Sequence, residues 1–423
     1  MKKIVLAYSG GLDTSVAVAW LREEYDAEVV TLTVDVGGGS LRPGVGERAI
    51  SAGASRAYVA DGRERFVEQF VWPAVQAGAM YQGAYPLATA LARPLIAQLL
   101  VEVAQKEGAD AVAHGCTGKG NDQVRFDLAV KALDGGLEVI APMRVGMGLS
   151  RDQEIDYAIE RGIDIPVTHA SPYSVDVNLW GRSIETGILE DPWVQPPADV
   201  YEWTADPADA PPPIEIVLGF SAGVPVTIDG AELGPVDLIE QLNALGGAHG
   251  VGRIDHVEDR LVGIKSREIY EAPAAAIIHA AHRALEALVL AKDQLRFNRV
   301  VGAEIAQATY DGLWFSVLQA DLRGYVAAAQ RLVSGDVRIR LDRGNAVIVG
   351  RRSPNSLYDR ALATYDVGDA FDHQGAVGFI SIFGLPLRTE ARRAAGVTPP
   401  EPILPTLEVE ITEPTRTREA VAG

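Results

Sequence analysis

Apolar and polar positions alternate in a strand–helix pattern through the first 165 residues. Short β-branched runs predict strands at residues 4–8, 29–34, 57–60, 110–113 and 137–141. Amphipathic stretches between them predict helices at residues 13–24, 63–76, 94–107 and 152–161. This alternation predicts an α/β fold with a parallel, Rossmann-like sheet that is covered by helices on both faces. Ligands of such sheets bind beyond the carboxyl ends of the strands.

The pattern changes after a proline-dense stretch at residues 192–213. Turn residues at 221–223 and 343–344 predict hairpins, and periodicity near 273–292 and 316–333 predicts long helices, so we expect a second, α+β domain. Beyond Arg388 a continuous helix is excluded by Pro399, Pro400, Pro402, Pro405 and Pro414. We therefore expect two domains and a proline-rich tail, at residues 1–165, 166–386 and 387–423.

Charge and cysteine content narrow the possible functions. The 423 residues include 38 Lys and Arg against 57 Asp and Glu, which gives a formal net charge of −19. An acidic surface repels phosphate backbones, so a nucleic-acid partner is disfavoured. The single cysteine, Cys116, excludes an intrachain disulfide and a Cys-rich zinc site. The N-terminal apolar run is too short for a signal peptide, and the apolar segment at 272–291 carries charges, so we expect a cytoplasmic protein without a membrane span.

A Gly-rich loop follows the first predicted strand and opens the first predicted helix. Gly10 and Gly11 allow a tight turn and a close approach to a ligand. Ser9, Thr14 and Ser15 add hydroxyl groups, and a helix N-terminus offers free N–H groups to an anion. The loop therefore predicts a phosphate site, although no Gly-Lys-Ser/Thr of a Walker A loop follows. A strand–helix turn without a ligand is the alternative.

A second polar loop, residues 114–125, follows the fourth predicted strand and so lies at the same sheet edge. Thr117 and Asn121 can bind carboxylates, Asp122 can hold an ammonium group, and Arg125 can bind an anion in bidentate fashion. A zwitterionic amino acid needs this mixture of groups. A Gly-rich surface loop with solvated charges is the alternative.

Two further segments, residues 171–183 and 252–270, mix polar and aromatic side chains as small-molecule sites do. By composition alone, hairpin loops with surface charges explain them better. His279 and His282 have no evident third ligand, so we expect no metal site made by the protein itself.

Together these segments resemble the argininosuccinate synthase family. The motif Ala-Tyr-Ser-Gly-Gly-Leu-Asp-Thr-Ser resembles the wider N-type ATP pyrophosphatases, whose nucleotide-binding domain is of the adenine nucleotide alpha hydrolase type. Three longer motifs resemble the argininosuccinate synthase family in particular: His-Gly-Cys-Thr-Gly-Lys-Gly-Asn-Asp-Gln-Val-Arg-Phe, Leu-Trp-Gly-Arg-Ser and Gly-Ile-Lys-Ser-Arg-Glu-Ile-Tyr-Glu-Ala-Pro. The resemblance runs from about residue 3 to Pro386.

The resemblance implies an enzyme of arginine biosynthesis that joins citrulline to aspartate. The reaction uses ATP with Mg²⁺, passes through a citrullyl-adenylate, and releases AMP and pyrophosphate. It needs no nucleophile from the enzyme. The resemblance also implies a homotetramer whose other partners are small molecules.

The same motifs assign roles by position. ATP would be bound by Ala7, Tyr8, Ser9, Gly10, Gly11, Leu12, Asp13, Thr14, Ser15, Val34 and Gly115. Aspartate would be bound by Thr117, Asn121 and Asp122. Citrulline would be bound by Tyr85, Ala90, Asn121, Arg125, Ser174, Ser183, Glu258 and Tyr270. The expected catalytic residues are Asp13, Asp122 and Arg125.

Three positions and the tail depart from the family pattern. Val34 stands where the family usually has Ala, Gly38 where it has Gln, and Ala90 where Ser is frequent. Val34 would narrow the nucleotide pocket if its side chain points inward. Either Thr89 replaces the hydroxyl missing at Ala90, or a neutral hydrogen bond worth about 0.5–1.5 kcal/mol is lost. The prolines beyond residue 386 argue against the C-terminal helix that the family uses in tetramer assembly, without excluding a tetramer.

Two alternatives stay open. The first is another ATP pyrophosphatase ligase, which would act on tRNA, use ammonia from glutamine, or take a different ureido acceptor. The acidic balance argues against tRNA, and the single cysteine argues against a fused Cys-dependent amidotransferase. The second alternative is a non-catalytic homologue.

Overall fold

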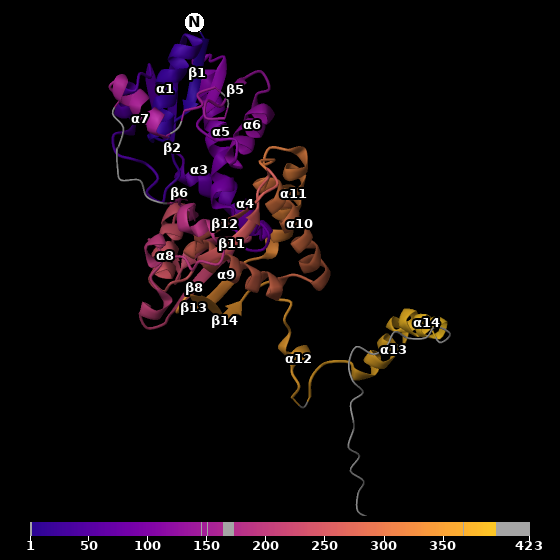
Figure 1. Cartoon of the computed structure of the whole chain (residues 1–423). Helices are drawn as coiled ribbons and strands as arrows, with labels where there is room; N and C mark the ends of the chain where they lie inside the picture. Colours follow the sequence, from indigo (N-terminus) through magenta and orange to yellow (C-terminus); the bar gives the residue numbers. More distant parts are fainter. Residues whose placement is uncertain (1, 145, 150, 164–172, 367, 395–423) are drawn as a thin grey trace, which may run out of the picture. The chain divides into compact units, whose positions relative to one another are not determined.

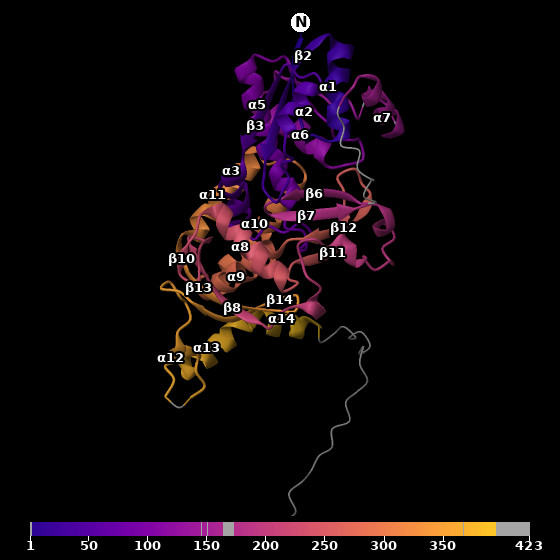
Figure 2. The same cartoon turned by 90° about the vertical axis from the view of Figure 1, so that its left-hand side faces the viewer.

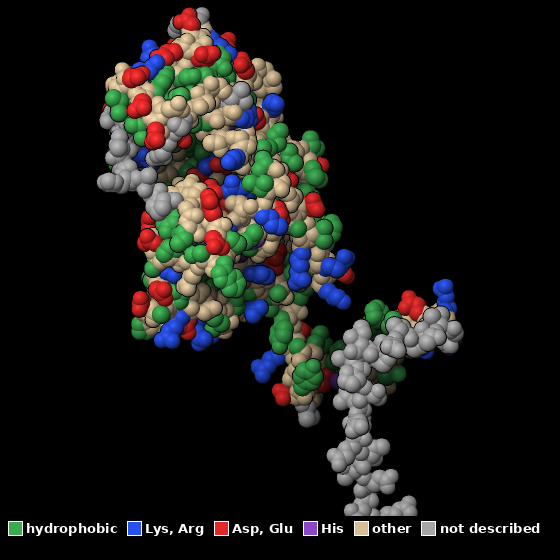
Figure 3. All heavy atoms as spheres, in the orientation of Figure 1, with side chains coloured by type: hydrophobic (Ala, Val, Ile, Leu, Met, Phe, Trp, Pro, Cys, Tyr) green, Lys and Arg blue, Asp and Glu red, His purple; other side chains and the backbone are tan. Residues whose placement is uncertain are grey.

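The structure is a computed structural model of the chain (Figure 1), and it describes residues 2–144, 146–149, 151–163, 173–366 and 368–394. Residue contacts divide the chain into two compact units, Met1–Tyr358 (unit 1) and Asp359–Gly423 (unit 2). The boundaries that we expected at residues 165 and 386 stay predictions. On the face of the molecule shown in Figure 3, acidic and basic side chains are interspersed over unit 1.

A five-stranded parallel sheet forms the N-terminal part of unit 1, which confirms the prediction from the alternating pattern. Its strands are β1 (Lys2–Ala7), β2 (Ala27–Asp35), β3 (Arg56–Asp61), β4 (Ala111–His114) and β5 (Glu138–Ile140). Their order is β3-β2-β1-β4-β5, so the winding reverses between β1 and β4. The carboxyl ends of those two strands are where this kind of sheet binds ligands.

Alternate side chains of β1 pack against helices on opposite faces of the sheet. Ile4 and Leu6 belong to one core, whereas Val5 belongs to the other. The first core contains residues of α1 (Leu12–Tyr25), α2 (Val45–Ser51) and α7 (Arg151–Glu160). The second contains residues of α5 (Ala88–Glu107) and α6 (Asp122–Leu133). Burial on both faces explains why these strands read as continuous apolar runs rather than alternating ones.

Helix α5 begins at Ala88, so our prediction of a start at Pro94 was wrong. Proline is common at the first position of a helix, but here it lies inside one. Proline lacks an N–H, so the carbonyl of Ala90 loses its helical donor. Burial of Leu91 and Leu95 on either side of the proline stabilises the continuous helix. The helix predicted at 63–76 forms in three joined pieces: α3 (Arg63–Phe66), a π-helical turn (Val67–Val71) and α4 (Trp72–Ala77).

Two antiparallel sheets build the remainder of unit 1. The first has the order β11-β12-β7-β6 and contains β6 (Ser174–Asn178), β7 (Gly181–Glu185), β11 (Arg253–Asp259) and β12 (Lys265–Glu271). The second has the order β10-β9-β8-β13-β14 and contains β8 (Ile214–Ser221), β9 (Val224–Ile228), β10 (Ala231–Glu232), β13 (Gly335–Asp342) and β14 (Asn345–Arg352). In Figures 1 and 2 the first of these sheets lies between the parallel sheet and the second.

This part of unit 1 forms both predicted hairpins and the two helices predicted near 273–292 and 316–333, together with two helices that were not predicted. The helices are α8 (Pro235–Ala248), α9 (Pro273–Val289), α10 (Lys292–Tyr310) and α11 (Val317–Ala329). Short 3-10 turns lie at Gly187–Glu190, Ala198–Val200, Pro207–Asp209 and Gln330–Leu332. Two positive φ values in succession close both predicted hairpins, at Ala222 and Gly223 and at Arg343 and Gly344.

Unit 2 corrects our expectation for the C-terminus. It contains α12 (Arg360–Ala363), α13 (His373–Phe383) and α14 (Leu385–Ala394), so a helix continues past Pro386 where we expected the tail to begin. The prolines from residue 399 onward lie outside the described residues. Among the described residues of this unit no side chain is buried, and α13 exposes Phe379, Ile380 and Phe383. Unit 2 therefore has no core of its own in the part that the structure describes.

Candidate active site

A cavity of about 540 Å³ opens at the carboxyl ends of β1, β2 and β4. Its wall is completed by residues of α5, α6 and β6. The expected site residues that line it are Ala7, Tyr8, Ser9, Gly11, Leu12, Asp13, Thr14, Val34, Gly115 and Asp122. The cavity thus lies where the strand order reverses, which is the position predicted for a ligand of this sheet.

The loop after β1 presents backbone N–H groups to this cavity. Gly10 has a φ of 72°, and a Cβ atom there would lie 2.9 Å from a methyl carbon of Val45, so the turn requires glycine. Helix α1 begins at Leu12, and no side chain caps its first N–H groups. Those groups, at the positive end of the helix dipole, can bind a phosphate.

Two residues that we expected to contact ATP do not line the cavity. Gly10 makes the turn behind the loop, and Ser15 is buried with its hydroxyl 2.9 Å from that of Tyr8. Ser9 and Thr14 share a hydrogen bond of 3.1 Å across the loop. The carboxylate of Asp13 lines the cavity without a hydrogen bond or ion pair to any described side chain.

A second, smaller cavity of about 110 Å³ adjoins the first, and Asp122 and Asp176 line both. Register in the β11-β12-β7-β6 sheet aligns Tyr270, Ser183 and Asp176 in one row across three strands. The expected residues that line this cavity are Tyr85, Asn121, Asp122, Arg125, Ser183, Glu258 and Tyr270. Segments far apart in the sequence therefore meet at one polar pocket beside the first cavity.

Arg125 of α6 is buried in the wall of the smaller cavity with one donor group unused. Its Nε donates to the carbonyl of Tyr310 at 3.0 Å, and its Nη1 donates to Asp122 at 2.9 Å. Its Nη2 is buried and has no hydrogen-bond partner among the residues that the structure describes. An unpaired buried donor is costly, and an anionic ligand would satisfy it.

Glu258 is held between two tyrosine hydroxyl groups at the other side of this cavity. Tyr270 donates to one carboxylate oxygen at 2.6 Å and Tyr310 donates to the other at 2.5 Å. Asn121 donates to the Tyr310 hydroxyl at 2.8 Å and accepts from the backbone N–H of Leu261 at 3.0 Å. This network fixes the carboxylate and the amide before any ligand arrives.

Asp122 lines both cavities and is bound by two arginines. Arg93 of α5 donates to Asp122 at 2.9 Å and contacts Asp176 at 3.0 Å, while Arg125 approaches from the opposite side. Burial acts to raise the pKa of Asp122, but the charges of Arg93 and Arg125 outweigh it and hold the pKa below its usual value. Asp122 is therefore a carboxylate at neutral pH and a weak proton acceptor.

Comparison with known proteins places this geometry in a family. The model of the arginosuccinate synthase N-terminal HUP domain matches residues 3–164, and that of the arginosuccinate synthase C-terminal domain matches residues 173–390. The chain belongs to the argininosuccinate synthase family. Members of this family are enzymes that ligate citrulline and aspartate at the expense of ATP.

Curated argininosuccinate synthases match over almost their whole length. The protein of Dehalococcoides mccartyi (strain ATCC BAA-2266 / KCTC 15142 / 195) is 53% identical over 393 residues, which cover 92% of this chain and 96% of that one. The protein of Symbiobacterium thermophilum is 54% identical over 392 residues, covering 92% and 98%. A solved U34-tRNA thiolase of Methanococcus maripaludis is 17% identical with a TM-score of 0.26, covering 41% of this chain and 60% of that one, and it carries no conclusion.

Besides Gly10 and Ser15, three further residues expected from the argininosuccinate synthase motifs line neither cavity. Ala90 is completely buried, and its neighbour Thr89 reaches the smaller cavity instead, donating to Asp176 at 2.8 Å. Thr117 is exposed on the loop before α6. Ser174 is exposed on β6, although its register partner Glu185 lines the cavity.

Several lining residues escaped the sequence reasoning. Arg93, Asp176, Glu185, Arg260 and Glu268 line the cavities but were not predicted. Arg93 had a usable signal, because it is the only charged residue in the otherwise apolar and small stretch from 88 to 97. The others lie among many surface charges and carry no local signal.

The two remaining departures from the argininosuccinate synthase pattern have structural consequences. Val34 lines the larger cavity, so its extra methyl groups narrow that wall. A Cβ atom at Gly38 would lie 2.5 Å from the carbonyl oxygen of Asn178, so the β6–β7 hairpin approaches too closely for any side chain there. Leu179 donates to the carbonyl of Val36 at 2.9 Å and ties the same two segments together.

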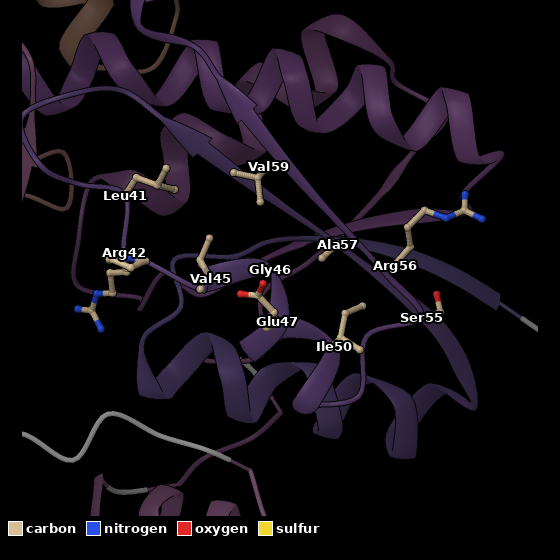
Figure 4. A pocket seen from close by; sticks show the side chains of 12 residues that line it. Leu41, Arg42, Val45, Gly46, Glu47, Ile50, Ser55, Arg56, Ala57 and Val59 are labelled. Atoms are coloured by element: carbon tan, nitrogen blue, oxygen red, sulfur yellow. The ribbon is translucent and has the colours of Figure 1, made fainter.

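Another hollow, of about 870 Å³, lies on the outer side of α2 and the edge strand β3 (Figure 4). It contains none of the residues predicted for substrates, and Ile50 and Val59 expose apolar surface in it. Among the described residues, no group of three His, Cys, Asp or Glu side chains is arranged to hold a metal ion. None of the helices in the described ranges is long and apolar enough to cross a bilayer. The cytoplasmic location stays a prediction.

Proposed function

We propose that this chain catalyses the reaction of its family, joining citrulline to aspartate with release of AMP and pyrophosphate. The observation that supports this most strongly is the pair of adjoining cavities. The larger one offers N–H groups at a helix N-terminus, and the smaller one offers the unpartnered, buried Nη2 of Arg125. A phosphate site and an amino-acid site in contact are what an adenylating ligase requires.

ATP would occupy the larger cavity with its phosphates on the loop from Ser9 to Thr14. The backbone N–H groups at the start of α1 would bind the two phosphates that leave as pyrophosphate. Val34 on strand β2 and Gly115, which directly follows β4, would lie at the nucleoside end. Mg²⁺ would enter as the complex with ATP, and the free carboxylate of Asp13 is an oxygen ligand of the kind that this ion prefers.

Citrulline would occupy the smaller cavity. Its α-carboxylate would pair with Nη2 of Arg125, and its α-ammonium would face Glu258 and Ser183. Tyr85 and Tyr270 stack at 4.3 Å and line the same cavity, so they would border the aliphatic part of the substrate. The ureido group would then point toward the junction with the larger cavity.

In the first chemical step the ureido oxygen of citrulline would attack the α-phosphorus of ATP. The bond from that phosphorus to the bridging oxygen breaks, and pyrophosphate leaves. In the second step the aspartate ammonium group loses a proton to water, and the resulting amine attacks the ureido carbon. The carbon–oxygen bond breaks, AMP leaves with the former ureido oxygen, and the new nitrogen releases its second proton to water. Holding the reactants together can lower such barriers by about 7–11 kcal/mol, so no covalent enzyme intermediate is needed.

Aspartate would bind near Asn121 and Asp122, with Thr117 at the outer end. Because the pKa of Asp122 is held low by Arg93 and Arg125, its role would be to orient the ammonium group rather than to take its proton. Asp122, which we expected among the catalytic residues, would thus act by positioning the substrate.

We propose a homotetramer as well, with unit 2 as an assembly element. Its support is that unit 2 buries none of its described side chains, while α13 carries Phe379, Ile380, Ile382 and Phe383 at more than half exposure. Large contiguous apolar surfaces of this kind are covered by partner subunits.

Purified protein with Mg-ATP tests the proposed reaction when citrulline and aspartate are added singly and together. Sustained pyrophosphate release that needs both amino acids, with argininosuccinate as the product, would support it. Folded protein that binds ATP but releases no pyrophosphate when both amino acids are present would contradict it. A screen of ureido compounds would then test a different acceptor. Light scattering of the same sample gives the subunit number.

A further inference from the structure

Arg42 is an exposed cation in the wall of the ATP cavity, and no carboxylate of a described residue pairs with it. It lies in the segment between β2 and α2, and its Nη1 reaches to 3.5 Å from the carbonyl oxygen of Gly10. Arg42 also lines the outer hollow, but in Figure 4 its guanidinium points away from Ile50 and Val59, which border that hollow.

The charge of Arg42 differs from those of the other basic groups that line this cavity. Arg93 is bound by Asp122 and Asp176. Both ring nitrogens of His114 are engaged, because Nδ1 accepts the N–H of Cys116 at 3.2 Å and Nε2 shares a hydrogen bond of 2.9 Å with Asp127. Within the described wall, Arg42 is therefore the cation that remains available to a phosphate.

Arg48 of α2 stands behind the same loop. Its Nη1 donates to the carbonyl of Pro43 at 2.7 Å, whereas its Nε and Nη2 are buried and form no hydrogen bond with any described group. A Cβ atom on Gly10 would lie 3.3 Å from that Nη2, so the guanidinium is packed directly against the turn. Burial raises the pKa of Tyr8, and the Ser15 hydroxyl and the charges of Arg48 and Arg42 act against that rise, which agrees with two cations close to the loop.

We infer that Arg42 is a further binding residue for the β- and γ-phosphates of ATP and for pyrophosphate, and that Arg48 is a positioning residue behind Gly10. This inference rests on the proposed function for the identity of the ligand. Arg42 lies on the cavity side of the loop and can contact phosphate oxygens directly. Arg48 acts through the loop, because its unpaired donors add positive potential there without reaching the cavity.

The inference predicts a difference between ligands. Charge-assisted hydrogen bonds from a guanidinium serve the most highly charged part of ATP, which becomes pyrophosphate. Removal of Arg42 should therefore weaken the binding of both pyrophosphate and ATP. It should leave the binding of AMP and of citrulline unchanged, because neither ligand extends onto the loop.

The experiment measures pyrophosphate binding to the full-length protein by titration calorimetry, without amino acids, and then product inhibition by pyrophosphate during turnover. Arg42→Gln is expected to weaken pyrophosphate binding about ten-fold and to raise the KM for ATP similarly, with the KM for citrulline unchanged. Arg65→Gln, which removes a half-buried arginine paired with Glu102, is the matched control and should change none of these constants.

Arg48 is tested by a conservative pair of variants. Arg48→Gln is expected to weaken pyrophosphate binding by several-fold, and Arg48→Lys is expected to restore most of it because the charge returns. A merely structural role would lower the melting temperature of both variants and would move the KM for citrulline as well.

A dissociation constant for pyrophosphate in Arg42→Gln that stays within two-fold of the wild-type value would overturn the inference. If the wild-type protein makes no argininosuccinate but Arg42→Gln still loses pyrophosphate binding, the proposed function fails and the phosphate site stands. If turnover is normal and pyrophosphate binding is unaffected, the proposed function stands and the role of Arg42 fails.

Discussion

Replacing Arg125 by lysine isolates the donor that we assign to the substrate carboxylate. The guanidinium has donors in three directions: Nε donates to the Tyr310 carbonyl at 3.0 Å, Nη1 donates to Asp122 at 2.9 Å, and Nη2 has no hydrogen-bond partner among the described residues. Lysine keeps the charge but cannot occupy all three directions at once. Asp122 retains Arg93 at 2.8 Å, so the substitution leaves no unpaired carboxylate and the fold should persist.

The loss of one charge-assisted hydrogen bond costs about 1.5–3 kcal/mol, so the KM for citrulline should rise about 10- to 100-fold in Arg125→Lys. The KM for ATP should change by less than about three-fold, because Arg125 does not line the ATP cavity. Steady-state assays with each substrate varied in turn measure both constants. Arg65→Lys makes the same change at an exposed pair and is the control. An unchanged KM for citrulline beside a raised KM for ATP would refute the assignment.

Three further predictions concern the loop, the fold and the junction of the cavities. Gly38→Ala should lower the free energy of unfolding, measured in urea titrations, by about 2–5 kcal/mol because the new Cβ atom would collide with Asn178. Gly39→Ala is the control: its Cβ atom would meet no atom within 4 Å, and it should lower the free energy of unfolding by about 1–2 kcal/mol. Glu107→Gln should cost about 1–3 kcal/mol at pH 7, since a tyrosine hydroxyl and two cations lower the pKa of this carboxyl to about 2. That difference should shrink as the pH falls from 4.5 toward 2, and a constant difference would contradict the prediction. Asp122→Asn should slow single-turnover ligation of bound substrates, and weaker aspartate binding with unchanged single-turnover chemistry would exclude its orienting role.

The parallel sheet and its phosphate loop could be predicted because their determinants are local. Each strand is a short apolar run, and the loop from Ser9 to Thr14 is contiguous, so neighbouring residues suffice to describe it. The start of α5 could not be predicted because proline is common at the first position of a helix, and only tertiary burial of Leu91 and Leu95 reveals that this helix runs through Pro94.

The smaller cavity was only partly predictable because it is assembled from distant segments. Arg93 and Asp176 contact each other at 3.0 Å although 83 positions separate them, and no local pattern reports such a pair. A shift of one residue also matters on a helix, because successive side chains point about 100° apart. Ala90 therefore faces the core while Thr89 faces the cavity, and a motif position alone cannot distinguish the two.

The origin of the oxygen in the released AMP tests the proposed chemistry most directly. Citrulline labelled with ¹⁸O in its ureido group, incubated with the protein, Mg-ATP and aspartate, should give AMP that carries one ¹⁸O atom on its phosphate. This follows because the ureido oxygen forms the bond to the α-phosphorus and leaves with AMP. Unlabelled AMP formed together with argininosuccinate would contradict adenylation of citrulline and would show that the two cavities couple ATP to ligation in another way.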